Sequence, residues 1–215
     1  QSVAVGFSAY FTNTVLLGLP IIQRAYGDEA LPNLYAIIGF HAPLLMSFGM
    51  LAMEFARRDG TPMKQAALQS LGRVVKNPLL IGITLGILTN MSGLSLPGVI
   101  DDATKMLATA VLPAALFGLG GALNQYKLRD SVGQALISSS LKLILHPTIA
   151  LILSHYVFKL DPSLVKVAVL TAAMPAGLNV YIFSTFYNRA TDIAANTVLC
   201  STVLGVVSIS VWLLF

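Results

Sequence analysis

Seven apolar blocks, separated by charged joints or by joints rich in glycine and proline, fill almost the whole chain of 215 residues. A membrane-spanning helix needs about 20 mostly apolar residues, and most of the blocks reach that length. Only 10% of the residues are charged, whereas a soluble domain carries roughly 25%. Because little is left for a globular catalytic or nucleic-acid-binding domain, we expect an all-α polytopic membrane protein. The blocks cover, approximately, residues 3–26, 34–55, 78–91, 106–123, 132–158, 164–187 and 193–215.

Basic residues are distributed unevenly among the joints. If the joints alternate sides, those after the second, fourth and sixth blocks carry eight Lys or Arg residues, and the others carry four. Cytoplasmic joints are enriched in these residues, so the first block is expected to begin in the cytoplasm. This orientation explains the net charge of +4 without a nucleic-acid partner. The single cysteine, Cys200, excludes an intramolecular disulfide and a cysteine-based metal site, and we expect no cofactor.

The first and sixth blocks each contain a proline near the middle, a glycine two residues from it and an asparagine within the same few turns. These residues are Asn13, Gly18 and Pro20 in one block and Pro175, Gly177 and Asn179 in the other. A proline within a helix removes a backbone hydrogen bond and clashes with the preceding turn, and in hydrocarbon the freed groups need protein or water partners. Two simple kinks are one interpretation. The other is a pair of broken helices around a substrate cavity, which is typical of inverted-repeat secondary transporters.

The order of the blocks also indicates an inverted repeat. Blocks three to seven form three spans, a broken span and a closing span, and blocks one and two match the end of such a unit. We therefore expect three further spans, about 90 residues, before the chain in the complete carrier. On this division, 1–56 and 126–215 belong to a transport bundle, 57–76 is a cytoplasmic joint and 77–125 holds two scaffold helices.

Five segments, in order along the chain, resemble the auxin efflux carrier family, which includes plant PIN carriers and bacterial permeases similar to malonate carriers. NTVLLGLPIIQRAYG (13–27) is similar to the family's fourth transmembrane segment. The sixth to ninth segments resemble KNPLLIGITLGIL, LPAALFGLGGAL, LKLILHP and AAMPAGLNVYIFSTFYN. The resemblance covers essentially the whole chain and implies a ten-helix fold of two inverted repeats, of which the chain holds helices 4 to 10. Helices 4 and 9 of that fold are broken at prolines and cross near the substrate.

The resemblance places Asn13 at the position of a substrate-contacting asparagine, and Pro20 and Pro175 at the crossing. The amides of Asn13 and Asn179, together with exposed backbone N–H groups, can bind a carboxylate, so that no buried side chain with a full positive charge is needed. We therefore expect a site for a small organic anion. Its predicted residues are Asn13, Thr14, Gly18, Pro20, Lys142, Pro175, Gly177 and Asn179.

Lys142 lies deep within an apolar block. Charged residues within spans usually face the bundle interior and mark a pathway. Lys142 is therefore either a cation near the anion or a lysine that pairs with a carbonyl to hold the broken helix. His146, four residues further on, shares its helix face and is expected to be a hydrogen-bonded packing residue rather than a group that titrates with transport. His41 and His155 carry less weight.

Small residues recur in the third and fourth blocks. Gly82 and Gly86 form a GxxxG match, and Gly118, Gly120 and Gly121 follow in the next block. Such faces let helices approach closely. The pattern predicts either packing within the chain or a homodimer through the scaffold helices, which the resemblance also implies.

These features predict a secondary transporter in lipid, in a bacterial cytoplasmic membrane, that moves a small organic anion by alternating access around the crossed helices. It needs no enzymatic step. One alternative is a sodium- or proton-coupled carrier of the bile-acid symporter or antiporter type, which usually has buried carboxylates near the crossing; blocks one and six contain none. Another is an intramembrane hydrolase that uses Ser8 of the sequence GFSA, but no companion histidine motif is recognisable.

Overall fold

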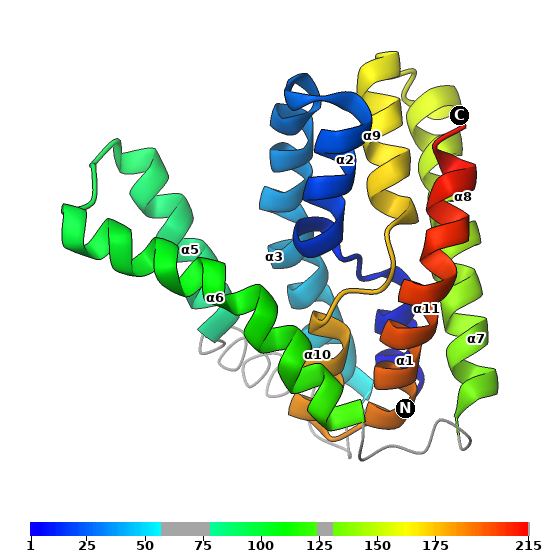
Figure 1. The fold of residues 1–215 in the computed structure, drawn as a ribbon. Helices are drawn as coiled ribbons and strands as arrows, with labels where there is room; N and C mark the ends of the chain where they lie inside the picture. Colours follow the sequence, from blue (N-terminus) through cyan, green and yellow to red (C-terminus); the bar gives the residue numbers. More distant parts are fainter. Residues whose placement is uncertain (57–77, 124–130, 215) are drawn as a thin grey trace. The chain divides into compact units, whose positions relative to one another are not determined.

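Residues 1–56, 78–123 and 131–214 are described by the structure, a computed structural model of the chain. Helices account for nearly all of these residues, as the apolar blocks predict (Figure 1). The chain divides into two compact units, one formed by residues 1–41 with 119–215 and the other by residues 42–118. The predicted cytoplasmic joint at 57–76 lies outside the described residues, and so do Lys127 and Arg129 of a second basic joint.

Three helices in the described part of the chain are long and apolar enough to cross a membrane, as an integral membrane protein requires. Asp28–Ala56 consists of a 3-10 turn, η2 (Asp28–Ala30), and α3 (Leu31–Ala56). Thr191–Trp212 is the single helix α11. Val132–Val157 alternates α-helical and π-helical turns, which are α7 (Val132–Ser140), η4 (Leu141–Leu145), α8 (His146–Leu151) and η5 (Ile152–Val157).

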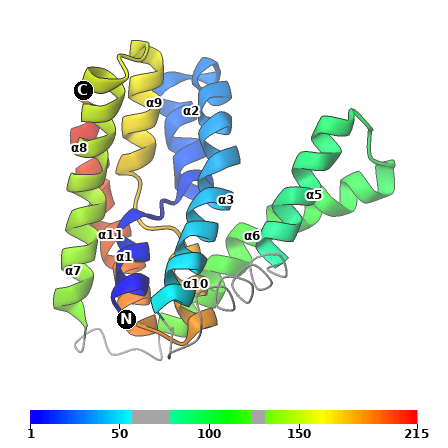
Figure 2. The same ribbon diagram turned by 180° about the vertical axis from the view of Figure 1, so that it is seen from behind.

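The first and sixth blocks are each split into shorter helices around a stretch of extended chain. The first contains α1 (Ser2–Tyr10), the π-helical turn η1 (Thr14–Gly18) and α2 (Leu19–Tyr26). The sixth contains α9 (Pro162–Ala173) and α10 (Asn179–Tyr187). Both views show α2 beside α9 and α1 beside α10 (Figures 1 and 2). Each half of one broken segment therefore lies beside one half of the other.

Local signals explain where α9 begins and ends. Asp161 caps its first turn by accepting a hydrogen bond from the Ser163 N–H at 2.9 Å, and Pro162 occupies the first helical turn, where its missing N–H costs nothing. Hydrogen bonds from Ser163 also lower the pKa of the Asp161 carboxyl group. At the other end, Met174 adopts an extended conformation directly before Pro175, as expected of a residue that precedes proline.

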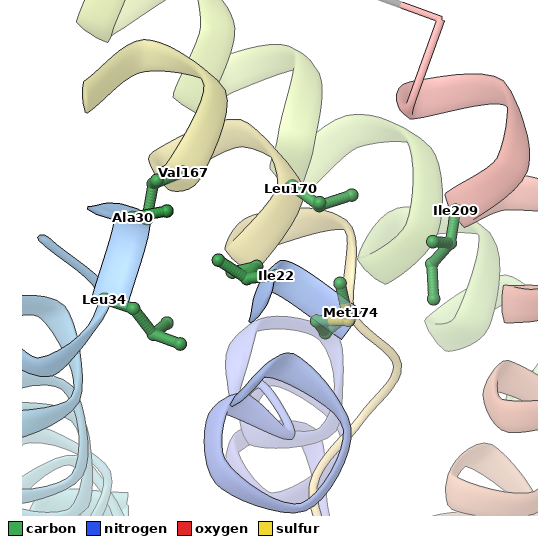
Figure 3. Packing of buried hydrophobic residues seen from close by; sticks show 7 residues of the cluster. All are labelled: Ile22, Ala30, Leu34, Val167, Leu170, Met174 and Ile209. Carbon is green, nitrogen blue, oxygen red and sulfur yellow. The ribbon is translucent and has the colours of Figure 1, made fainter. Parts of the chain in front are cut away.

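A cluster of buried apolar side chains holds α2, α3, α9 and α11 together (Figure 3). Lipid tails are as apolar as these side chains, so close van der Waals packing rather than the hydrophobic effect stabilises such contacts. The cluster fixes the half of the bundle that α2 and α9 form. Its members are Ile22, Ala30, Leu34, Val167, Leu170, Met174 and Ile209.

Stacked aromatic rings hold the opposite half, between α1 and α10. The Phe7 and Phe183 rings are nearly parallel, 10° apart, with centroids separated by 4.0 Å. Phe7 also stacks on Phe11 at 5.0 Å, and Phe183 contacts Tyr187 at 4.9 Å. The rings therefore connect α1 and α10 next to the two breaks.

In the unit formed by residues 42–118, α5 (Pro78–Ser92) and α6 (Gly98–Leu123) form a hairpin. The turn uses Gly93, whose φ of +65° is in the left-handed region that favours glycine. The α6 helix begins before the predicted apolar block. Its early turns carry Asp101 and Lys105. The Lys105 Nζ and an Asp101 carboxylate oxygen form an ion pair across one helical turn at 2.6 Å, so charged residues extend the helix beyond the apolar block.

The GxxxG face of α5 borders a groove of about 1010 Å³ between α5 and α6. A Cβ atom added to Gly82 or Gly86 would meet no described atom within 4 Å. Close packing of this face on another part of the chain is therefore not seen among the described residues. Gly118, Gly120 and Gly121 lie in α6, but the surroundings of these three residues are not described.

Candidate functional site

The two breaks meet in a short antiparallel contact, in which Thr12 pairs with Ala176. The Asn13 N–H donates to the Pro175 carbonyl at 2.9 Å, and the Gly177 N–H donates to the Phe11 carbonyl at 3.1 Å. These bonds satisfy backbone groups that would otherwise be unpaired within the membrane. The antiparallel pairing confirms the predicted inverted orientation of the two broken blocks.

Two side chains complete the backbone hydrogen bonds of the crossing. The Thr12 N–H donates to Nε2 of His41, in α3, at 3.2 Å, and the Ala176 N–H donates to Oγ of Ser201, in α11, at 3.1 Å. The His41 ring also contacts Phe11, with centroids 4.9 Å apart. Sequence reasoning gave His41 little weight and did not single out Ser201, because helical spacing does not indicate which turn of a neighbouring helix passes the crossing.

Two helical segments begin at the crossing. Asn13 caps the segment 14–26 by accepting the Leu16 N–H on Oδ1 at 3.2 Å, and Thr14 is buried at its first position. Asn179 is the first residue of α10. Both asparagines are half-buried, and the Asn179 side chain has no hydrogen bond to a described residue. A helix N-terminus carries partial positive charge, so this region combines two such ends with two amides.

Pro20 is not at the crossing, which corrects the expectation for this residue. It lies in the first turn of α2 and is exposed, whereas the chain is extended at residues 11–13. The π-helical bond from the Gly18 N–H to the Asn13 carbonyl, at 3.0 Å, widens the turn before the proline. Pro20 is the seventh residue of the helical segment 14–26, and this wider turn accommodates its missing N–H, so Pro20 follows the break rather than producing it. Pro175 lies within the other break, as predicted.

Two predicted glycines lie where chain segments approach closely. A Cβ atom on Gly177 would lie 3.1 Å from the Thr12 carbonyl oxygen and 3.3 Å from the Phe11 ring. At Gly18 the corresponding distances are 3.4 Å to the Asn13 carbonyl oxygen and 3.7 Å to the Met174 side chain. Gly177 is therefore the glycine on which the contact between the two breaks most depends.

Lys142 is completely buried in the π-helical turn η4. Its Nζ donates to the Ala172 carbonyl at 2.6 Å and lies 2.9 Å from Nδ1 of His146. Ala172 is in the last turn of α9, where helix carbonyls lack intrahelical partners. Of the two sequence interpretations, pairing with a carbonyl of the broken helix is the contact that is present. His146 is hydrogen-bonded, as predicted.

Ser8 does not have the surroundings of a hydrolytic nucleophile. Its Oγ donates to the Ala4 carbonyl of the same helix at 3.0 Å, and the side chain is completely buried. Among the described residues no histidine forms a hydrogen bond with Ser8, although a serine nucleophile needs such a base. The geometry of the crossing, by contrast, is that of a broken-helix carrier.

Comparison with known proteins agrees with this geometry. The model of the family described as "Membrane transport protein" matches residues 1–213. Similar proteins include an "Uncharacterized transporter" of Methanothermobacter thermautotrophicus, 27% identical over 95% of the chain, and "Auxin efflux carrier component 8" of Arabidopsis thaliana, 26% identical over 87%. A third is the "Putative malonate transporter" of Rhizobium meliloti, 25% identical over 95%.

The chain spans somewhat less than two thirds of these three relatives, covering 65%, 63% and 64% of their lengths. The match to the family model, residues 1–213, includes both broken segments. The chain belongs to the membrane transport protein family, the family of the auxin efflux carriers.

Proposed function

We propose that the complete carrier moves a small organic anion, a carboxylate, by alternating access around the crossed helices, and that it catalyses no chemical step. The observation that carries this proposal is the meeting of two helical N-termini, with the amides of Asn13 and Asn179, at the Thr12–Ala176 crossing. Partial positive charge and N–H donors at one place favour an anion. A relative named for malonate, a dicarboxylate, supports the same substrate class.

The predicted site residues take different roles in this proposal. Asn13, Thr14 and Asn179 contact the carboxylate through side-chain donors at the two helix starts. Gly18 and Gly177 let the chain segments approach, and Pro175 keeps the second break extended. Lys142 holds the last turn of α9, which leads into the second break, through its hydrogen bond to the Ala172 carbonyl. Pro20 supports the start of α2.

A paired-substrate experiment tests the proposed class. The full-length protein is reconstituted in liposomes, and uptake of labelled mono- and dicarboxylates is compared with uptake of their uncharged primary amides. We expect saturable uptake of at least one carboxylate and none of its amide, because the two helix starts at the crossing favour a negative charge that the amide does not carry. Protein-free liposomes are the control. Equal uptake of the amide would contradict an anion site.

We place the complete carrier in a bacterial cytoplasmic membrane, and the unequal charge of the predicted joints supports an orientation with the start of α1 inside. The open GxxxG face of α5 supports a homodimer through this hairpin, since small residues on a lipid-exposed helix permit close helix contact.

Gly86→Leu is expected to convert the dimer to a monomer. The leucine side chain separates two helices that pack through Gly82 and Gly86, whereas its Cβ atom meets no described atom within 4 Å in the chain itself. Native mass spectrometry of the detergent-solubilised protein measures the change. Gly133→Leu, at an equally open position in α7, is the matched control and leaves the mass unchanged. A Gly86→Leu protein with the wild-type oligomeric mass would exclude this interface.

A further inference from the structure

Each of the two residues that pair at the crossing donates its backbone N–H to a side chain of a long neighbouring helix. The Thr12 N–H donates to Nε2 of His41 at 3.2 Å, and the Ala176 N–H donates to Oγ of Ser201 at 3.1 Å. Thr12 is 2% exposed, and Ala176 and Ser201 are completely buried. Because these groups are buried from water, each N–H depends on the side chain that accepts its hydrogen bond.

The two acceptors occupy corresponding places in the two halves of the fold. His41 is in α3, which follows the first broken segment, and Ser201 is in α11, which follows the second. The acceptor lies 29 residues after its donor in the first case and 25 residues after it in the second. In each half, the helix that follows a break therefore supplies the acceptor for that break.

Each of these helices also packs on the residue that precedes the donor. The His41 ring contacts the ring of Phe11, with centroids 4.9 Å apart. Gly205, one helical turn after Ser201 and on the same face, lies against Pro175, because a Cβ atom added to Gly205 would be 3.2 Å from the Pro175 Cγ atom. A packing contact and a hydrogen bond thus hold each break on the helix that follows it.

We propose that His41 and Ser201 are positioning residues of the carboxylate site, which hold the two breaks in the geometry that binds the anion. This inference rests on the proposed function of the crossing as an anion site. Each residue acts through the backbone N–H whose hydrogen bond it accepts, and not through contact with the anion. Without one of these acceptors, a buried N–H group of the crossing loses its partner, and conformations in which the breaks separate become more favourable.

Both amides of the proposed site are attached to the backbone that these bonds hold. Asn13 directly follows Thr12, and its own N–H donates to the Pro175 carbonyl at 2.9 Å. Asn179 begins α10, three residues after Ala176. A shift at the crossing therefore moves the two amides relative to each other and lowers the fraction of carriers with a competent site. The apparent dissociation constant of the anion rises by the inverse of that fraction.

Ser201→Ala tests the acceptor in α11. The substitution removes Oγ without adding volume, and we expect carboxylate binding to the full-length protein to weaken about tenfold, or about 1.4 kcal/mol, which is the order of the cost of an unpaired buried donor. Ser210→Ala is the matched control, because Ser210 is exposed and its Oγ donates within α11 to the Val206 carbonyl at 2.8 Å. Titration calorimetry with malonate, and with each carboxylate that the liposome assay shows to be transported, measures both affinities.

Two substitutions of His41 separate its hydrogen bond from its packing. His41→Phe keeps an aromatic ring beside Phe11 but loses the acceptor, and we expect it to weaken binding about tenfold as well. His41→Gln loses the ring but keeps an acceptor, a carbonyl oxygen, for the Thr12 N–H, so its affinity is expected to be close to that of the wild type. A role of His41 in packing alone would give the opposite order of affinities.

Hydrogen exchange of the protein without anion provides a second readout. We expect peptides that contain residues 11–13 and 174–177 to exchange faster in Ser201→Ala and His41→Phe than in the wild type, and Ser210→Ala to exchange as the wild type does. Wild-type carboxylate affinity in both Ser201→Ala and His41→Phe overturns this inference and leaves the proposed function in place, even where thermal unfolding shows lower stability. A wild type that binds no carboxylate overturns the proposed function, and this inference with it.

Discussion

Asn179→Asp is expected to weaken anion binding by at least a hundredfold. The substitution changes an amide into a carboxylate of the same shape at the first position of α10, beside the crossing. At a separation of about 4 Å and an effective dielectric constant near 20, two like charges repel by about 4 kcal/mol, which is more than the roughly 2.7 kcal/mol that a hundredfold change requires. Equilibrium binding of the preferred carboxylate to the full-length protein measures the effect.

Loss of folding does not explain that result, because an acidic residue in the first turn of a helix stabilises it. Asn90→Asp, at an exposed position in α5, is the matched control and is expected to bind the anion as the wild type does. Wild-type affinity in Asn179→Asp would show that the anion binds elsewhere.

Gly177→Ala is expected to separate the two breaks and to abolish transport. The new methyl group would lie 3.1 Å from the Thr12 carbonyl oxygen, a backbone atom that cannot move independently of the crossing. The bonds between Gly177 and Phe11 and between Asn13 and Pro175 are then strained or lost. Overpacking of this kind costs typically 1–3 kcal/mol. Thermal unfolding of the solubilised full-length protein and uptake in liposomes measure the two effects.

Gly133→Ala is the control, and we do not expect it to lower the thermal stability of the protein. Gly133 lies within α7, and an added Cβ meets nothing within 4 Å. Alanine is favoured over glycine in a helix by about 1 kcal/mol, so this variant is expected to unfold at the same or a higher temperature and to transport normally. A Gly177→Ala protein as stable and active as Gly133→Ala would contradict the close crossing.

Much of the candidate site could be predicted because its residues leave local signals. Pro175 and Gly177 interrupt an otherwise apolar helix, and Lys142 is conspicuous in an apolar block, so each is recognised from its neighbours. Pro20 gave a misleading signal. A proline within an apolar block can mark a break, but the π-helical turn before Pro20 lets this proline lie inside the helical segment 14–26.

His41 could not be predicted for a different reason. Its place at the crossing depends on one hydrogen bond to Thr12, 29 residues away in sequence. The sequence likewise left two interpretations of Lys142. The hydrogen bond to Ala172, 30 residues further on, agrees with the one in which Lys142 pairs with a carbonyl of the broken helix. Contacts between two helices leave no repeating pattern in the sequence of either helix.

By itself, the sequence determined that the chain is a helical membrane protein with two interrupted segments. Hydrocarbon offers no hydrogen-bond partners, so long apolar blocks have to form helices, and proline with glycine interrupts them. The tertiary structure decided where the interruptions meet. Thr12 and Ala176 pair across 164 positions of sequence, and that pairing depends on how α1, α2, α9 and α10 pack together, which no local residue pattern specifies.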